Sequence, residues 1–279
     1  MNGNQLGQHL KNNGMYYFLI LLAAWGLKFH YSRAGSDELL WVLAPTAGLV
    51  ELISGIAFVN EAHTGFVSQG HRFIVAPACA GINFLIIAFC MATFSNMHAF
   101  RRHRSKILWF AGCFLSAYLL TIAVNTLRII ISMHTYTADI RLGWFTPARI
   151  HRLEGVIIYF FFLNLFYMII NKVSYRLRGG AAGKKPATAR PGVARTNYIG
   201  WICAGLIPYS WYGFHTLVLP LINGALKQNP DRFAEHSTMV LVASGLVLGV
   251  ILLVRIIVDH FTVRRRKPIK LESTWRPGF

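Results

Sequence analysis

Charged residues are scarce in this chain, and acidic residues are the scarcest. Charged residues make up 14% of the 279 positions, with 10 Asp and Glu against 28 Lys and Arg, whereas 54% of all residues are hydrophobic. The apolar residues form long blocks separated by short basic stretches. A soluble domain of this composition would expose too much apolar surface, so the chain is expected to be a polytopic helical membrane protein.

Several chemical signatures are also missing. The sequence has no Gly-rich phosphate-binding motif and no G-x-S-x-G nucleophile elbow. It has only 4 cysteines, at different expected depths, and no pair of histidines with a convincing zinc spacing. We therefore expect neither a metal site nor a cofactor.

The apolar blocks predict an all-α fold, a polytopic transmembrane helical bundle of about seven spans, because lipid offers the backbone no outside hydrogen-bond partners. The candidate spans are Met15–Leu27, Leu39–Val59, Cys79–Met97, Ile107–Ser132, Glu154–Asn171, Tyr198–Ile222 and Met239–Val258. The first has 13 residues before Lys28, fewer than the roughly 17–25 that cross a bilayer, so it starts earlier or lies along the interface. We treat it as retained, because Ala23, Ala24 and Trp25 make a poor signal-peptide cleavage site.

The basic residues are distributed unevenly between the two sets of loops. Four loops on one side hold 19 Lys and Arg, and four on the other hold 6. The richer loops are residues 28–38, 99–106, 172–197 and 260–279, and the poorer loops are residues 1–14, 60–78, 133–150 and 223–237. This positive-inside pattern predicts that the richer loops are cytoplasmic, so the charge requires no nucleic acid as a partner. Basic stretches beside the spans also attract anionic membrane lipid.

Three ionisable or reactive residues are then expected at the same membrane depth. The third span starts at Cys79, the fourth passes Arg128 near its end, and the fifth begins just after His151. Although 49 and 23 residues separate them in the sequence, the three residues are therefore expected at one membrane depth, at the outer face. If the three helices are neighbours, we expect the three side chains to form a single site that faces outward.

Cys79 and Arg128 also have simpler explanations. Cys79 could be a small buried apolar side chain, but it lies at the start of a helix, where the dipole favours a thiolate. Arg128 could extend to the nearby interface, although a guanidinium within an apolar span costs at least about 2.5–3.5 kcal/mol and usually has a partner. Asn125 is on the same helical face, and Glu51 is a candidate ionic partner at similar depth.

His151 could be an ordinary loop residue beside two arginines. Glu154 follows it at i+3, so the carboxylate could hold the orientation of the imidazole. His63, His71 and His134 are rival histidines on the same side.

These residues resemble the exosortase/archaeosortase family. The resemblance rests on Ala78-Cys79-Ala80-Gly81-Ile82-Asn83, on Asn125-Thr126-Leu127-Arg128, and on His151 at the head of a helix. That family consists of polytopic membrane cysteine transpeptidases, and the similarity extends from about Leu39 to Asn171. Ala80 departs from the pattern, because family members often have Ser after the cysteine, which leaves the subfamily and the substrate motif open.

The resemblance implies a role for each of the three residues. Cys79 would attack a peptide carbonyl and form a thioester acyl-enzyme. Arg128 would stabilise the developing oxyanion or the thiolate. His151 would protonate the departing amine and then activate the incoming amine or water. The candidates for supporting contacts are Asn83, Asn125, Glu51 and Glu154.

The resemblance also implies the substrate and the location. The substrate would be a secreted protein whose C-terminal end carries a short motif, one transmembrane helix and a basic tail. Cleavage would take place at the outer face of a bacterial cytoplasmic (inner) membrane. The acceptor stays open between a lipid amine, a polysaccharide component and water.

A Gly-, Ala-, Lys- and Pro-rich stretch divides the chain. Residues 176–197 are expected to be a basic cytoplasmic linker. It would join a catalytic transmembrane core, residues 1–175, to a two-span accessory module with a basic C-terminal tail, residues 198–279.

Two other classes of function remain. The chain could be a non-enzymatic component of a cell-envelope or exopolysaccharide export assembly, or a small-solute carrier, in which Arg128 and Glu51 form an ion pair or a substrate path. It could also be a membrane acyltransferase that uses His151. Cys79→Ala would be harmless in the non-enzymatic component, and a peptide thioester trapped on Cys79 would exclude the acyltransferase.

Overall fold

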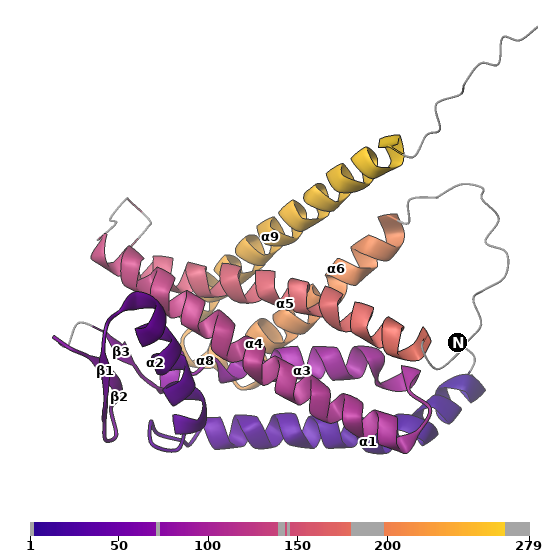
Figure 1. Ribbon diagram of the computed structural model, residues 1–279, viewed down its shortest axis with the longest axis horizontal. Helices are drawn as coiled ribbons and strands as arrows, with labels where there is room; N and C mark the ends of the chain where they lie inside the picture. Colours follow the sequence, from indigo (N-terminus) through magenta and orange to yellow (C-terminus); the bar gives the residue numbers. More distant parts are fainter. Residues whose placement is uncertain (1–2, 71–72, 139–142, 144–145, 180–197, 266–279) are drawn as a thin grey trace, which may run out of the picture.

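The computed structural model describes residues 3–70, 73–138, 143, 146–179 and 198–265 as a bundle of long helices with a small sheet at one end (Figure 1). The helices are α1 (Gly3–Tyr31), α2 (Leu40–Ser54), η1 (Pro77–Cys79), α3 (Ile82–Asn96), η2 (Met97–Ala99), α4 (His103–Thr137), α5 (Pro147–Gly179), α6 (Tyr198–Gly213), η3 (Phe214–Val218), α7 (Leu219–Ile222), α8 (Ala225–Gln228) and α9 (Pro230–Arg265). The strands are β1 (Phe58–Glu61), β2 (Gly65–Ser68) and β3 (Ile74–Val75).

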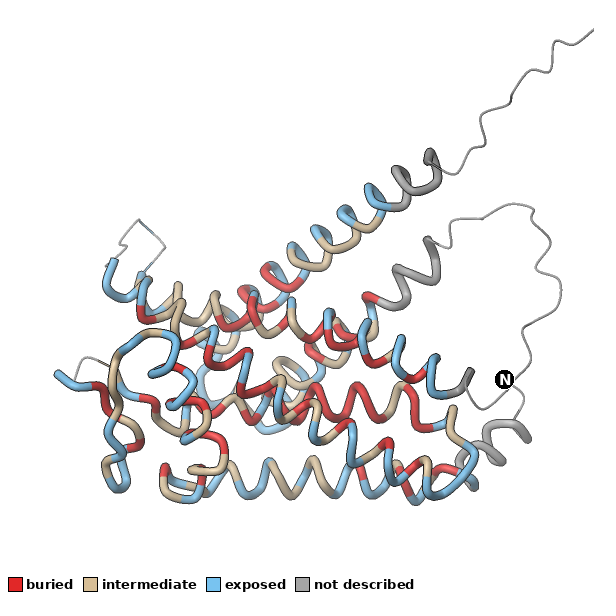
Figure 2. Tube along the Cα trace, in the orientation of Figure 1, coloured by how far each residue is buried: buried red, intermediate tan, exposed pale blue. Residues whose placement is uncertain are grey.

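Helix α3 is the centre of the bundle. It packs against α1, α4, α5 and α6, and most of its residues are buried, as the red stretch in Figure 2 shows. A helix that is apolar on all sides is expected in the interior, because no face of it prefers water. The N-terminal end of α3 is preceded by η1, which ends at Cys79.

Four helical segments are long and apolar enough to cross a membrane. They are Pro77–Ala99, His103–Thr137, Pro147–Leu177 and Pro230–Val258. The prediction of an all-α helical membrane protein is therefore confirmed. The same criteria, applied to the described residues, do not reproduce all seven predicted spans.

The second predicted span, Leu39–Val59, is too long. Helix α2 ends at Ser54, where Gly55 adopts φ 71° and its N–H bonds the Glu51 carbonyl at 2.8 Å. The 15 residues of α2 extend about 22 Å, which is shorter than the roughly 30 Å of a bilayer core. The chain then continues as β1 rather than as helix.

The strands form a three-stranded antiparallel sheet in the order β1-β2-β3. The β1–β2 turn contains His63 at φ 64°, a left-handed backbone conformation that is uncommon for a residue other than glycine. The sheet packs on α2 and covers the end of the bundle at which α3 and α5 start (Figure 1). We call this the sheet end. The sequence patterns predicted no strands here.

Residues 28–38 lie at the sheet end, which corrects their predicted side. Lys28 Nζ donates to Asn83 Oδ1 at 2.9 Å, and His63 Nδ1 lies 2.8 Å from the Asp37 carboxylate. Helix α1 therefore ends beside the start of α3, and α1 runs opposite to the predicted direction. The cause is α2, which is too short to return the chain across the bundle.

Residues 1–14 belong to the opposite end for the same reason. Lys106, at the start of α4, donates its Nζ to the side chain of Asn13 at 2.7 Å. Exchanging the two basic residues of 28–38 for the one of 1–14 changes 19 against 6 into 18 against 7. The predicted charge asymmetry is therefore preserved in this revised assignment of the loops.

Helices α6 and α9 pack against α5 and against each other. The α6–α9 contact is close at Gly205, where a Cβ atom would lie 2.8 Å from Leu248 Cδ1. Residues 180–197 of the predicted linker and residues 266–279 of the predicted tail lie outside the described residues. The division into core and accessory module stays a prediction.

Candidate functional site

Cys79 lies on a tight turn that leads into the central helix. The Cys79 N–H bonds the Ala76 carbonyl at 2.7 Å, and the Ala80 N–H bonds the Pro77 carbonyl at 3.0 Å. Proline suits the first position of this short 3-10 helix, because its fixed φ is helical and it has no N–H to satisfy. Cys79 is partly exposed, unlike a cysteine that is fully buried in the interior.

Gly81 makes the turn possible in two ways. Its φ of 70° is a left-handed conformation that side chains oppose. A Cβ atom there would also lie 3.1 Å from Thr121 Cγ2 and 3.5 Å from the Tyr159 hydroxyl. Glycine therefore lets the backbone after Cys79 approach α4 and α5 closely.

A chain of hydrogen bonds leads from this turn to Arg128. The Asn125 side-chain amide donates to the Cys79 carbonyl. The Tyr159 hydroxyl donates to Asn125 Oδ1 at 2.9 Å and accepts from Arg128 Nη1 at 3.2 Å. The nucleophile candidate and the buried cation are thus joined through two intervening side chains.

Arg128 is joined in turn to His151. Its Nη2 lies 3.0 Å from His151 Nε2, and the other ring nitrogen, Nδ1, hydrogen-bonds the Ser132 hydroxyl. Because a guanidinium only donates, Nε2 must accept in this arrangement, so we assign a neutral imidazole whose Nδ1–H donates to Ser132. The structure therefore brings Arg128 and His151 into direct contact.

Helix α4 presents its polar groups on one face. Asn125, Arg128 and Ser132 are spaced by three and four residues, which places them on one stripe. Asn125 is fully buried. The sequence analysis identified Asn125 and Arg128 but missed Ser132, although its i+4 spacing from Arg128 is visible in the sequence.

Helix α5 also carries its site residues on one face, with a spacing of four residues. His151, Gly155 and Tyr159 lie on successive turns of one face. A Cβ atom at Gly155 would lie 3.2 Å from Arg128 Nε, so glycine leaves room for the guanidinium. The Tyr159 ring stacks on Phe84 with centroids 4.9 Å apart, and Arg128 Cζ lies 5.4 Å from the Tyr159 ring centroid. The sequence analysis missed Tyr159 and Gly155, which this spacing from His151 could have revealed.

The electrostatics of the site centre on Arg128. A thiolate on Cys79 and the carboxylate of Glu154 would each be attracted to the guanidinium. Among the described residues, neither carboxylate oxygen of Glu154 has a hydrogen-bond partner, and the same is true of Arg128 Nε. The sequence suggested that Glu154 orients the imidazole, whereas the structure places the Ser132 hydroxyl on His151 Nδ1.

Two other predicted supporting residues lie outside this hydrogen-bond chain. Asn83 is exposed and accepts from Lys28. Glu51 is exposed, and its Oε2 accepts from the Phe58 N–H at 3.4 Å. The predicted Arg128–Glu51 ion pair is therefore replaced by neutral contacts of Arg128 with Tyr159 and His151.

The cluster combines the thiol of Cys79, from the turn before α3, with a guanidinium from α4 and an imidazole from α5. The hydrogen bonds described for the imidazole lead to Arg128 and Ser132, so Arg128 lies between His151 and the turn that carries Cys79. Within the described ranges, no three His, Cys, Asp or Glu side chains are grouped so as to hold a metal ion. The chemistry available to the cluster is nucleophilic and acid–base.

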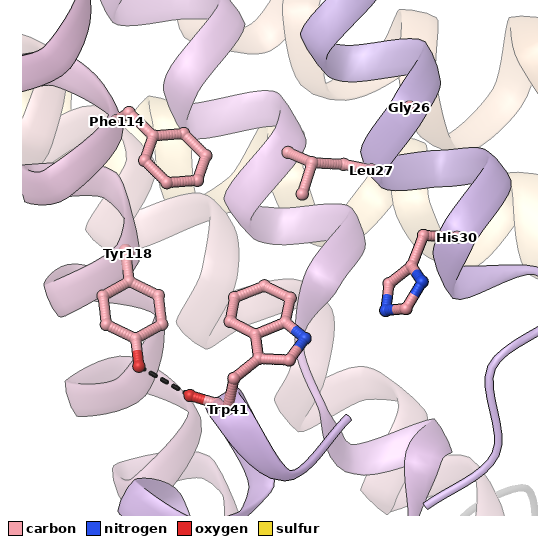
Figure 3. A pocket seen from close by; sticks show the side chains of 6 residues that line it. All are labelled: Gly26, Leu27, His30, Trp41, Phe114 and Tyr118. Carbon is pink, nitrogen blue, oxygen red and sulfur yellow. Dashed lines mark hydrogen bonds between the residues drawn. The ribbon is translucent and has the colours of Figure 1, made fainter. Parts of the chain in front are cut away.

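A separate hollow of about 460 Å³ lies between α1, α2 and α4 (Figure 3). Leu27, Trp41 and Phe114 line it together with Tyr118, whose hydroxyl donates to the Trp41 carbonyl at 2.6 Å. None of its lining residues belongs to the cluster of Cys79, Arg128 and His151. Apart from His30, its lining is glycine, aliphatic or aromatic (Figure 3).

Comparison with known proteins matches residues 15–168, more than half of the chain, to the family described as transmembrane exosortase. No curated protein and no solved structure matches the chain. The matched segment contains Cys79, Arg128 and His151 and ends within α5.

Proposed function

Because the chain belongs to the transmembrane exosortase family, we propose that it is a membrane cysteine peptidase or transpeptidase. Its substrate is a secreted protein with a C-terminal motif, a transmembrane helix and a basic tail. The enzyme cleaves this sorting signal through a thioester on Cys79. Arg128 and His151 supply the electrostatic and acid–base steps.

The observation that supports this proposal is the contact between Arg128 and His151 and the hydrogen-bond chain that links Arg128 to the turn of Cys79. Arg128 contacts His151 directly at 3.0 Å and is linked to the Cys79 carbonyl through Tyr159 and Asn125. These residues come from positions far apart in the sequence. A guanidinium in an apolar bundle is costly, so its place beside a thiol and an imidazole favours a functional role over a structural one.

The first step forms the bond between sulfur and the substrate carbonyl carbon. The Cys79 thiol loses its proton to Nε2 of His151, which first gives up its hydrogen bond from Arg128 Nη2, and the thiolate attacks the carbonyl. Protonation of Nε2 keeps that bond from forming again, because two cations do not hydrogen-bond. The guanidinium is then free to bind the oxyanion that develops on the substrate, where a good donor typically contributes about 2.7–4 kcal/mol.

The second step breaks the peptide C–N bond. The imidazolium of His151 gives its proton to the departing amine, which leaves the acyl group on Cys79 as a thioester. The neutral imidazole then takes a proton from the incoming amine or water, which attacks the thioester and restores the thiol. Ser132, bonded to Nδ1, keeps the same imidazole nitrogen directed at the reacting atoms in both steps.

We further propose that the sheet end faces outward from a bacterial inner membrane. With residues 1–14 and 28–38 exchanged, the loops assigned to the opposite end hold 18 Lys and Arg and those assigned to the sheet end hold 7, which by the positive-inside rule favours a cytoplasmic opposite end. A substrate helix with a basic cytoplasmic tail would then present its motif at the depth of Cys79.

The test is processing of a secreted protein with such a C-terminal signal, taken from the same genome and co-expressed with the full chain. C-terminal cleavage is followed by intact mass in cells that express the wild type, Cys79→Ala or Cys79→Ser. Cys90→Ala is the matched control, because Cys90 is a buried cysteine on α3. We expect cleavage to be abolished by both Cys79 substitutions and retained in the control.

A peptide thioester on Cys79, trapped by rapid denaturation and identified by mass, would establish the covalent step. Unchanged cleavage in Cys79→Ala would overturn the peptidase proposal and favour a non-enzymatic envelope component. Release products distinguish the two forms of the reaction, because water gives a free carboxylate and an amine acceptor gives an added mass.

A further inference from the structure

The C-terminal helices reach the catalytic cluster, although they lie beyond the family match, which ends at residue 168. Tyr212 of α6 is 4% exposed and packs on Phe160 of α5 with ring centroids 5.5 Å apart. It also interacts electrostatically with Tyr159 and Arg128. Helix α6 therefore packs on α5 next to Tyr159 of the site.

A second contact of this kind lies at the start of α5. Glu235, in the second turn of α9, accepts two hydrogen bonds on Oε1. Arg149 Nε donates at 2.8 Å, and Arg152 Nη2 donates at 3.1 Å. One carboxylate oxygen from the C-terminal module thus holds two guanidinium groups of the catalytic helix.

The two arginines flank His151 in the first turns of α5. Because they are three residues apart, Arg149 and Arg152 are neighbours on one helical face and repel each other. Glu235 offsets this repulsion and ties the face to α9. The other support described for this end of α5 is the pair of His151 hydrogen bonds to Arg128 and Ser132 of α4, together with the local bond from the Ile150 N–H to the Thr146 carbonyl at 2.9 Å.

We propose that Glu235 is a positioning residue for His151, acting through Arg149 and Arg152. This inference rests on the proposed peptidase function. Helix ends fray unless their backbone or side chains are held, and His151 lies in the second turn of α5. Fixing that turn fixes the distance between the imidazole and Arg128, on which both proton transfers depend.

The expected effect is moderate. Side chains of Arg149, Arg152 and Glu235 are about one third exposed, at 31%, 35% and 30%, so solvent screens the interaction. A displaced imidazole slows proton transfer without removing it. We expect Glu235→Gln to lower the acylation rate about three- to tenfold and to leave the KM for the substrate protein unchanged.

The experiment compares three full-length variants with the wild type in lipid nanodiscs. Glu235→Gln removes the charge, Glu235→Asp keeps it on a shorter stem, and Asp231→Asn removes a carboxylate from the first turn of the same helix. Each is measured for substrate cleavage and for amide hydrogen exchange in residues 147–159. The exchange measurement needs no substrate.

We expect Glu235→Gln to show faster amide exchange at the start of α5 and slower acylation. Glu235→Asp should be intermediate in both measurements, and Asp231→Asn should behave like the wild type. The proposal is overturned if Glu235→Gln matches Asp231→Asn in both measurements, or if exchange rises while the rate is unchanged. If Glu235→Gln does not accumulate, Arg149→Gln removes the shorter of the two bonds and is judged by the same criteria. Absence of cleavage in the wild type would instead count against the peptidase function, while the exchange data still test the contact.

Discussion

The Tyr159→Phe substitution tests the hydrogen-bond chain of the site without changing the packing of the ring. The substitution removes the hydroxyl that donates to Asn125 and accepts from Arg128. It keeps the ring that stacks on Phe84 and lies beneath the guanidinium. Any effect on activity therefore reports on the link between Arg128 and the turn of Cys79.

The magnitude follows from the two bonds that are lost. A hydrogen bond from a charged donor contributes about 1.5–3 kcal/mol, and one between neutral groups about 0.5–1.5 kcal/mol. Asn125 is fully buried, so its Oδ1 cannot recruit bulk water in exchange. A combined loss of about 2–4 kcal/mol in the reacting arrangement corresponds to a rate lowered about 30- to 1,000-fold.

The assay is single-turnover formation of the Cys79 thioester with the co-purified substrate protein. Tyr167→Phe is the matched control, since Tyr167 is also buried on α5, two turns further from the site. Thermal unfolding in detergent checks that both variants are folded. A thioester rate in Tyr159→Phe within threefold of that in Tyr167→Phe would refute the role assigned to the hydroxyl.

Two further predictions concern the turn and the imidazole. Gly81→Ala should lower the free energy of unfolding by about 1–3 kcal/mol, because the φ of Gly81 is 70° and an added Cβ atom would lie 3.1 Å from a neighbouring side chain. Gly112→Ala should not destabilise the protein, because an added Cβ atom at Gly112 would meet open space, and thermal melts compare the two variants. Ser132→Ala should slow thioester formation about fivefold, because His151 Nδ1 loses the partner that fixes its tautomer; an unchanged rate would show that this bond is dispensable.

The depth of the catalytic candidates was predictable from the sequence, because helical rise converts residue numbers into height along a span. Cys79, Arg128 and His151 lie near the ends of apolar blocks, and the structure brings all three to the sheet end. Their mutual contacts were not predictable in this way. Hydropathy fixes height but not which helices are neighbours, nor which faces they turn toward each other.

The error at the second span has a local cause. Residues 39–59 are apolar throughout most of their length, which satisfies a count of span residues. Gly55 ends the helix early, and the chain changes to a strand whose first two residues, Phe58 and Val59, are apolar. Residue counting does not distinguish these two conformations, so the direction of α1 was predicted incorrectly along with the length of α2.

The supporting residues were missed for a different reason. The sequence analysis looked for a carboxylate to accompany Arg128 and chose Glu51, because buried charges are commonly paired. The structure uses the neutral side chains of Tyr159 and His151. Neutral partners are hard to recognise in a sequence, because Tyr and Ser occur on many helical faces without a functional role.

Neutral partners also suit the chemistry that we propose. A guanidinium in direct contact with a carboxylate has little capacity for a second anion, since separating a buried ion pair is strongly unfavourable. Arg128 instead hydrogen-bonds a phenol and an imidazole, and its interaction with Glu154 includes no hydrogen bond among the described residues. The guanidinium can therefore exchange the imidazole for an oxyanion at the cost of one hydrogen bond to a neutral group. That exchange becomes favourable at the moment when His151 takes a proton, which couples activation of the thiol to stabilisation of the charge it creates.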